Sequence, residues 1–145
     1  MEGADFFTMG YEGRKTDELI ATLHSAGVQC VLDIRFNPVS VYRPELSKTN
    51  FERLLARHGL SYFHIREWGV PREVRAKAVE AGTRETIWEW YDASVVEQFF
   101  EKNLHRFLNL EHPVAMLCME CDPSECHRHL LFNALESRRL RGFDL

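Results

Sequence analysis

The segment Cys118–His129, "CMECDPSECHRH", concentrates the residues of this chain that are capable of thiol, metal or proton chemistry. It holds three of the chain's four cysteines, together with Glu120, two histidines and Arg128. Three interpretations fit these residue types: a reactive thiol, a metal site, or a polar junction between a buried strand and a helix. The segment therefore locates a candidate site without identifying a substrate.

In the thiol interpretation, Cys118 ends a predicted strand, and Cys126 and His127 fall in the first turns of a helix predicted to begin at Pro123. A helix N-terminus carries unpaired N–H groups and about half a positive charge. That charge stabilises anions and lowers the pKa of a nearby thiol. We therefore predict Cys118 or Cys126 as a nucleophile and His127 as a general base. The alternative is two buried structural cysteines and a histidine that only bonds a neighbouring loop.

In the metal interpretation, the segment supplies enough sulfur and nitrogen donors for a tetrahedral zinc site. The candidate ligands are Cys118, Cys121, Cys126 and either His127 or His129. Their spacing is irregular, and a strand followed by a helix separates side chains. No G-x-G-x-x-G or P-loop pattern is present, so no other cofactor is expected.

The elements that must position these residues alternate between strands and helices. Apolar runs predict strands over residues 5–11, 28–34, 60–65 and 114–119, with a short fifth strand from residue 142. Helical periodicity and capping patterns predict helices over residues 16–27, 49–59, 94–110 and from 123, with a short helix near 71. This order predicts a single three-layer α/β domain over residues 1–145, with a mainly parallel sheet of four or five strands and helices on both faces.

Right-handed crossovers place every loop that follows a strand at the same edge of such a sheet, where ligands bind. Asp33 and Glu120 end two of the predicted strands and are candidate acid and base groups. The alternative for Asp33 is an ion pair with a nearby arginine that only fixes the loops. The residues predicted to hold an anionic ligand at this edge are Tyr11, Arg14, Arg35 and Arg128.

Composition limits the class of protein. The net charge of −4 argues against a non-specific nucleic-acid binder, which usually carries a basic face. No apolar run is long enough for a membrane span, and the first ten residues lack the pattern of a secretory signal. We therefore expect a cytoplasmic protein whose cysteines are thiols or metal ligands rather than disulfides. The aromatic cluster Trp88–Tyr91 fits a hydrophobic anchor, a homodimer contact or a lid.

Four motifs together resemble the domain of unknown function 488 family of bacterial and archaeal proteins. They are "GYEGR", "LDIRFNPVS", "FERLLARHGLSYFHI" and "CMECDPSECHRHLL". The residues that match the hallmark positions of the family are Asp33, Arg35, Pro38, Cys118, Glu120, Cys126, His127 and Arg128. Cys121 and the "EWGVP" turn depart from the family pattern. The resemblance supports the fold and the site and implies no particular reaction.

These observations lead to one functional expectation and two alternatives. We expect a small enzyme, a transferase or hydrolase, that acts on an anionic or phosphorylated small molecule such as a nucleotide at the carboxyl edge of the sheet. The first alternative is a non-catalytic module that binds a ligand or zinc. The second is an interaction protein in nucleic-acid transactions.

Overall fold

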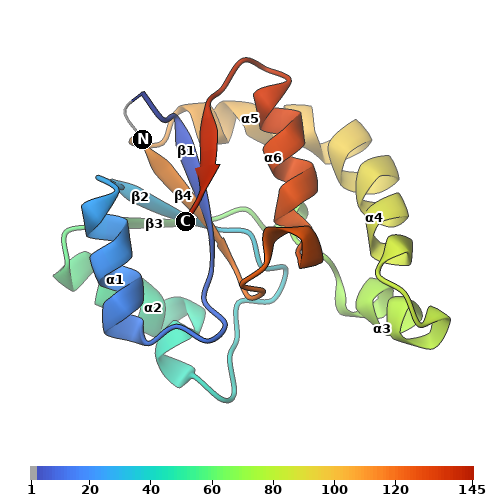
Figure 1. Cartoon of the computed structure of the whole chain (residues 1–145), viewed down its shortest axis with the longest axis horizontal. Helices are drawn as coiled ribbons and strands as arrows, with labels where there is room; N and C mark the ends of the chain where they lie inside the picture. The colour runs from blue at the N-terminus through green and yellow to red at the C-terminus, as the bar shows by residue number, and fades with distance from the viewer. Residues whose placement is uncertain (1–2) are drawn as a thin grey trace.

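Five strands form one sheet in which every neighbouring pair is parallel (Figure 1). The computed structural model describes residues 3–145. The strands are β1 (Phe6–Gly10), β2 (Cys30–Asp33), β3 (Ser61–His64), β4 (Val114–Cys118) and β5 (Gly142–Asp144), and their order in the sheet is β3-β2-β4-β1-β5. Every residue of β1, β2 and β4 is buried, as expected for strands covered on both faces. The predicted parallel sheet, including its fifth strand, is confirmed.

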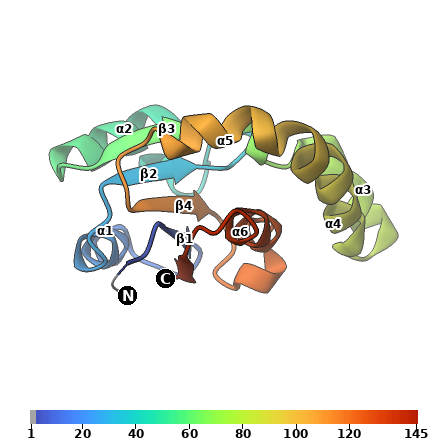
Figure 2. The same cartoon turned by 90° about the horizontal axis from the view of Figure 1, so that it is seen from above.

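Helices cover both faces of this sheet, so the three predicted layers are confirmed (Figure 2). On one face, α1 (Thr16–Ser25) and α2 (Lys48–Arg57) pack on strand side chains such as Phe7 and Val31. On the other face, α5 (Phe100–Leu108) and α6 (Arg128–Glu136) pack on Phe6 and its neighbours. Side chains alternate between the two faces along each strand, which divides the core in two.

Two helix starts differ from the predicted ones. Helix α2 begins one residue before the predicted Thr49, after Ser47. No helix begins at Ser94, because α4 (Glu85–Tyr91) continues into a π-helical segment (Asp92–Phe99) and then into α5. The backbone amides that a Ser94 cap would satisfy already have partners in the preceding turn.

Helix α3 (Arg72–Ala81) and α4 form an arm that extends beyond the sheet layers (Figures 1 and 2). Gly82 ends α3 in the left-handed conformation, with a φ of 71°, and the chain turns there into α4. Tyr91 ties the arm to the domain, because its hydroxyl donates a hydrogen bond of 2.7 Å to the Trp68 carbonyl oxygen. Within residues 3–145, no helix has the length and apolar character that crossing a bilayer requires.

Candidate functional site

The predicted meeting of distant segments at the carboxyl edge of the sheet is present. Strands β2 and β4 are neighbours, with Asp33 opposite Leu117. The His127 ring lies beside the end of β2, because its Nε2 atom hydrogen-bonds to the Ile34 carbonyl oxygen at 3.1 Å. A carbonyl can only accept, so Nε2 carries the proton. Arg35 and Cys118 line the same cleft.

The loop after β4 is held against β1 by a close backbone approach. A Cβ atom on Gly10 would lie 1.7 Å from the Glu120 carbonyl oxygen, so only glycine fits there. The guanidinium of Arg128 donates to the carbonyl oxygens of Glu120 and Cys121. These contacts position the backbone that carries Cys118 and Glu120.

The prediction that a helix begins at Pro123 is wrong. Residues Pro123–Glu125 form a single 3-10 turn, which Asp122 caps by accepting a hydrogen bond from the Ser124 amide at 3.0 Å. Cys126 is then extended, with φ −122° and ψ 145°, and α6 begins only at Arg128. Cys126 therefore precedes the helix, and His127 occupies its N-cap.

The expectation that all cysteines are free is corrected for one pair. The sulfur atoms of Cys118 and Cys126 are in contact and paired as a disulfide, and both side chains are buried. Cys30 and Cys121 are free. Cys30 is fully buried in the core, and this burial raises the pKa of its thiol to about 12.

Arg128, a predicted ligand residue, instead points its side chain into the protein and is fully buried. Nη1 donates to Cys118 Sγ at 3.1 Å, and Nε donates to Thr8 Oγ1 at 3.2 Å. Its other hydrogen bonds go to backbone carbonyl oxygens rather than to a carboxylate. Burial lowers the pKa of this guanidinium, since a charge in a low-dielectric interior needs a counter-charge. The negative charges of Asp144 and Glu120 act on it, and the Cys118 sulfur would supply a further one as a thiolate once the disulfide is reduced.

For Asp33, the structure shows an ion pair, which is the alternative to acid–base chemistry. Arg35 binds it in two places, from Nε to Oδ1 at 2.9 Å and from Nη2 to Oδ2 at 2.7 Å. The Tyr62 hydroxyl donates a further hydrogen bond of 2.7 Å to Oδ2. These contacts occupy the carboxylate of Asp33 fully. The Nη1 atom of Arg35, in contrast, is buried without a partner among the described residues.

A cavity of about 830 Å³, here called the cationic cleft, opens at this edge. Its wall includes five cations, Arg35, Lys48, Arg66, Arg72 and Arg75, but only one acid, Glu73, and it reaches Cys118. Within residues 3–145, Lys48, Arg66 and Arg72 take part in no ion pair. A wall with this excess of unpaired positive charge attracts anions.

The two remaining predicted ligand residues lie in different places. Tyr11 lines the cationic cleft, with the guanidinium carbon atoms of Arg35 and Arg43 each 5.6 Å from its ring centroid. Arg14 does not line it, because its Nη2 atom donates to the Leu145 carbonyl oxygen at 2.6 Å. The prediction for Arg14 is therefore wrong: the parallel pairing of β5 with β1 brings the last residues of the chain within its reach.

His127 is positioned beside a sulfur atom, as the thiol interpretation requires. Its Nδ1 atom lies 3.7 Å from Cys126 Sγ, and the ring is buried. Burial and the positive charge of Arg75 lower the pKa of His127 to about 3. The ring is therefore neutral at pH 7, and its Nδ1 atom can accept a hydrogen bond from the Cys126 thiol once the pair is reduced. With this pKa it is a weak base, which favours a positioning role over proton transfer.

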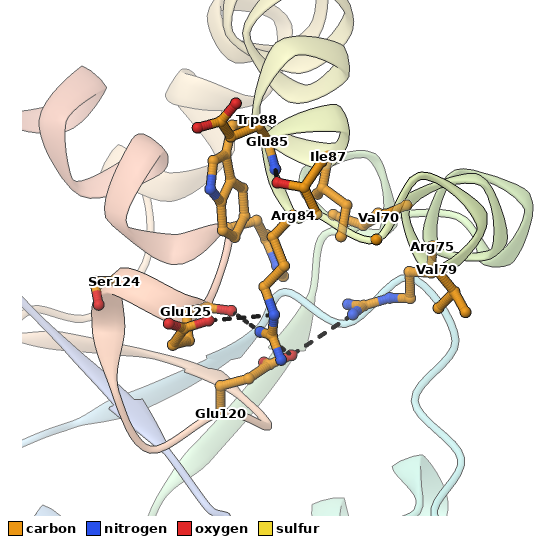
Figure 3. A pocket seen from close by; sticks show the side chains of 14 residues that line it. Val70, Arg75, Val79, Arg84, Glu85, Ile87, Trp88, Glu120, Ser124 and Glu125 are labelled. Carbon is orange, nitrogen blue, oxygen red and sulfur yellow. Dashed lines mark hydrogen bonds and ion pairs between the residues drawn. The ribbon is translucent and has the colours of Figure 1, made fainter.

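Glu120 lies between the guanidinium groups of Arg75 and Arg84 (Figure 3). Its Oε1 atom is 3.6 Å from Arg75 Nη1 and 3.8 Å from Arg84 Nη1. Its Oε2 atom is buried without a hydrogen-bond partner among the described residues. One of the carboxylate oxygens lies within 4.8 Å of both Cys118 Sγ and Cys126 Sγ. Glu120 therefore places a carboxylate oxygen beside both sulfur atoms.

The predicted four-ligand zinc set is not assembled. Cys121 is exposed, and in the described part of the chain the only compact group of potential ligands is Cys118, Glu120 and Cys126. Three guanidinium groups contact these atoms, from Arg128, Arg75 and Arg84. Positive charges at this distance disfavour a divalent cation at this group.

Sequence reasoning missed Lys48, Arg72 and Arg75 as cleft residues. Arg72 and Arg75 are three positions apart on α3, which puts them on one helical face. That spacing is visible in the sequence, but it does not show that this face turns toward the sheet edge. Lys48 reaches the cleft because the Pro38 carbonyl oxygen accepts a hydrogen bond from its backbone amide at 2.8 Å.

Comparison with known proteins gives one match. The family model described as "Domain of unknown function DUF488" matches residues 15–135 of the chain. No curated protein and no solved structure matches the chain at a significant level. The matched range contains Asp33, Arg35, Cys118, Glu120 and Cys126.

Proposed function

Since the chain belongs to the DUF488 family, whose description names no reaction, we infer its function from the site, and we propose a thiol-dependent transferase or hydrolase. Its substrate is an anionic, phosphorylated small molecule. One observation carries the proposal: the cationic cleft, with five cations and one acid in its wall, is lined by Cys118. Guanidinium groups bind phosphate oxygens through paired, charge-assisted hydrogen bonds.

Cys118 is the nucleophile in this proposal, and Cys126 is its partner thiol. Arg128 donates to the sulfur of Cys118, whereas His127 lies beside the sulfur of Cys126. The active form requires reduction: two molecules of a cytoplasmic thiol such as glutathione give two electrons and two protons to the pair and leave as a disulfide. We accordingly place the enzyme in the cytoplasm, where such thiols are abundant.

The chemical steps follow from the placement of Glu120. Its carboxylate takes the proton of Cys118, and the thiolate attacks the electrophilic centre of the substrate held in the cationic cleft. A bond to sulfur forms, and the leaving group departs with its electron pair and takes the proton from Glu120. An acceptor, water in a hydrolase, then attacks the intermediate and gives its proton to Glu120. The Cys118 sulfur leaves and takes this proton back from Glu120, which restores the thiol and the carboxylate and completes the cycle.

The anion position within the cleft is suggested by Arg35. Its Nε and Nη2 atoms are held by Asp33, so the guanidinium is rigid. Its Nη1 atom has no partner among residues 3–145 and is available to one phosphate oxygen after a small shift. Arg72 and Lys48 are exposed cations in the wall of the cleft, and their long side chains can bind the remaining phosphate oxygens.

The proposal is tested by alkylation of the reduced protein with iodoacetamide, with each cysteine followed by peptide mass spectrometry. Cys118 should react at pH 7, and inorganic phosphate should slow its reaction while leaving that of the exposed Cys121 unchanged. Turnover of p-nitrophenyl phosphate should disappear in C118S and persist in C121S. Two results together would support the non-catalytic metal module instead. Phosphate would fail to slow the alkylation of Cys118, and the purified protein would contain stoichiometric zinc.

A further inference from the structure

A second cavity, here called the Trp88 cavity, lies between the α3–α4 arm and the loop after β4 (Figure 3). Its volume is about 570 Å³, within the range of small-molecule sites. Val70, Ala78, Ile87 and Trp88 form its apolar wall. The opposite wall contains Glu120, so the cavity reaches the carboxylate that serves Cys118 in the proposed mechanism.

The charge of the Trp88 cavity differs from that of the cationic cleft. Its wall contains three acids, Glu85, Glu120 and Glu125, and two cations. Both cations are already paired: Arg84 with Glu120 and Glu125, and Arg75 with Glu120 (Figure 3). No excess positive charge remains to attract a phosphate group. The cavity therefore suits an uncharged ligand part, or one with hydrogen-bond donors.

The two cavities are adjacent. Val70 and Arg75 line both of them, so the same side chains separate the cationic cleft from the Trp88 cavity. A single ligand can therefore place a phosphate in the cleft and extend past these residues into the second cavity. Cys118 lies in the cleft near this boundary, beside Glu120.

Trp88 favours a planar ligand. Its indole is half-buried and is fixed edge-to-face against the His129 ring, with centroids 4.8 Å apart and planes at 87°. A fixed indole offers a flat apolar surface on which an aromatic ring can stack. On the opposite wall, the Glu120 carboxylate can accept hydrogen bonds from an amino group, since its Oε2 atom has no partner among residues 3–145.

We propose that the Trp88 cavity binds the base of a nucleoside monophosphate whose phosphate lies in the cationic cleft, with adenine, cytosine or guanine preferred over uracil because each of these three carries an exocyclic amino group. This inference rests on the proposed function, because it takes the phosphate site in the cleft as given. It adds the substrate class, which the cleft alone does not define.

The test is calorimetric titration of the reduced protein with inorganic phosphate, adenosine and the four common nucleoside 5′-monophosphates. At least one of the adenine, cytosine and guanine nucleotides should bind at least tenfold more tightly than phosphate and more tightly than the uracil nucleotide. Trp88→Ala should remove this advantage and leave the affinity for phosphate unchanged. The matched control is Trp90→Ala, since Trp90 lies two residues away and does not line the cavity.

The outcomes separate this inference from the proposed function. If phosphate protects Cys118 but no nucleotide binds more tightly than phosphate, the base site is refuted and the proposed function stands. The same conclusion follows if W88A and W90A weaken nucleotide binding equally. If neither phosphate nor any nucleotide binds or protects Cys118, the proposed function itself fails.

Discussion

The guanidinium of Arg128 donates a hydrogen bond from Nη1 to the Sγ atom of Cys118 at 3.1 Å. Arg128 is fully buried, and its other donors go to a hydroxyl and to backbone carbonyl oxygens. The structure thus holds a buried positive charge against a sulfur atom. When the cysteine pair is reduced, a thiolate at Cys118 neutralises this charge, so the charged forms of both groups stabilise each other.

The first prediction concerns the ionisation of Cys118. Its alkylation rate in the reduced protein should show a midpoint below the reference thiol pKa of about 8.5, because the contact with Arg128 favours the thiolate. Arg128→Lys should raise the midpoint, since lysine keeps the charge but cannot reach all four acceptors. The exposed Cys121 provides the internal control. An R128K protein that is folded by circular dichroism and has an unchanged midpoint would contradict the role given to Arg128.

The second prediction compares two arginines of the cationic cleft. Arg35→Ala should lower the free energy of unfolding by about 3–5 kcal/mol, because it leaves the buried Asp33 carboxylate without its partner. Arg72→Ala should change it by less than about 0.5 kcal/mol, because Arg72 is exposed and makes no ion pair within residues 3–145. Phosphate affinity should fall in R72A, and more so at low ionic strength. Urea unfolding measures the stability of each variant, and calorimetry measures its phosphate affinity. An equal loss of stability in R35A and R72A would refute a structural role for Arg35 alone.

The contrast between Arg35 and Arg72 shows what the sequence can predict. Strand ends are readable from apolar runs, and parallel strands share an edge, so Arg35 and Cys118 could be placed together. Whether Arg35 faces a ligand or Asp33 depends on rotamers that no sequence pattern specifies. Arg72 lies on α3, which follows a loop and is oriented by tertiary packing. The position of Arg72 in the cleft was therefore not predictable from the sequence.

The start of α6 shows a second limit. Asp122, Pro123 and Glu125 are strong helix-start signals, and the chain does turn there, with Asp122 as the cap. The burial of His127 and Arg128 beside β2 and β4 outweighs this local preference for a helix. The backbone of Cys126 is therefore extended rather than helical. Local signals located the turn correctly, but tertiary contacts decided where the helix begins.

The third prediction tests how the loop after β4 is held. Gly10→Ala should destabilise the fold by about 1–3 kcal/mol, because its Cβ atom would overlap the Glu120 carbonyl group. It should also slow Cys118 alkylation, since the displaced loop moves Glu120 and the acceptors of Arg128. Gly59→Ala is the control: its φ of 74° makes alanine unfavourable, yet it lies far from the site. Equal slowing of alkylation in both variants would indicate a general effect of lower stability.

The fourth prediction is a pH dependence of stability caused by His127. Its pKa is about 3 in the folded chain, against an ordinary value of 6.5 for a histidine in an unfolded chain, so below pH 6.5 the unfolded state binds more protons. Stability due to the neutral ring is therefore complete above pH 6.5 and should fall, by up to about 1.4 kcal/mol per pH unit, as pH drops toward 3. His127→Gln keeps a donor for the Ile34 carbonyl oxygen but does not titrate, so its stability should fall less steeply. Urea unfolding between pH 7 and 4 measures the slopes, with the exposed His105→Gln as control. If H127Q and H105Q show the same slope as the unmodified chain, His127 is not buried in its neutral form, and the packing of the site around it must differ.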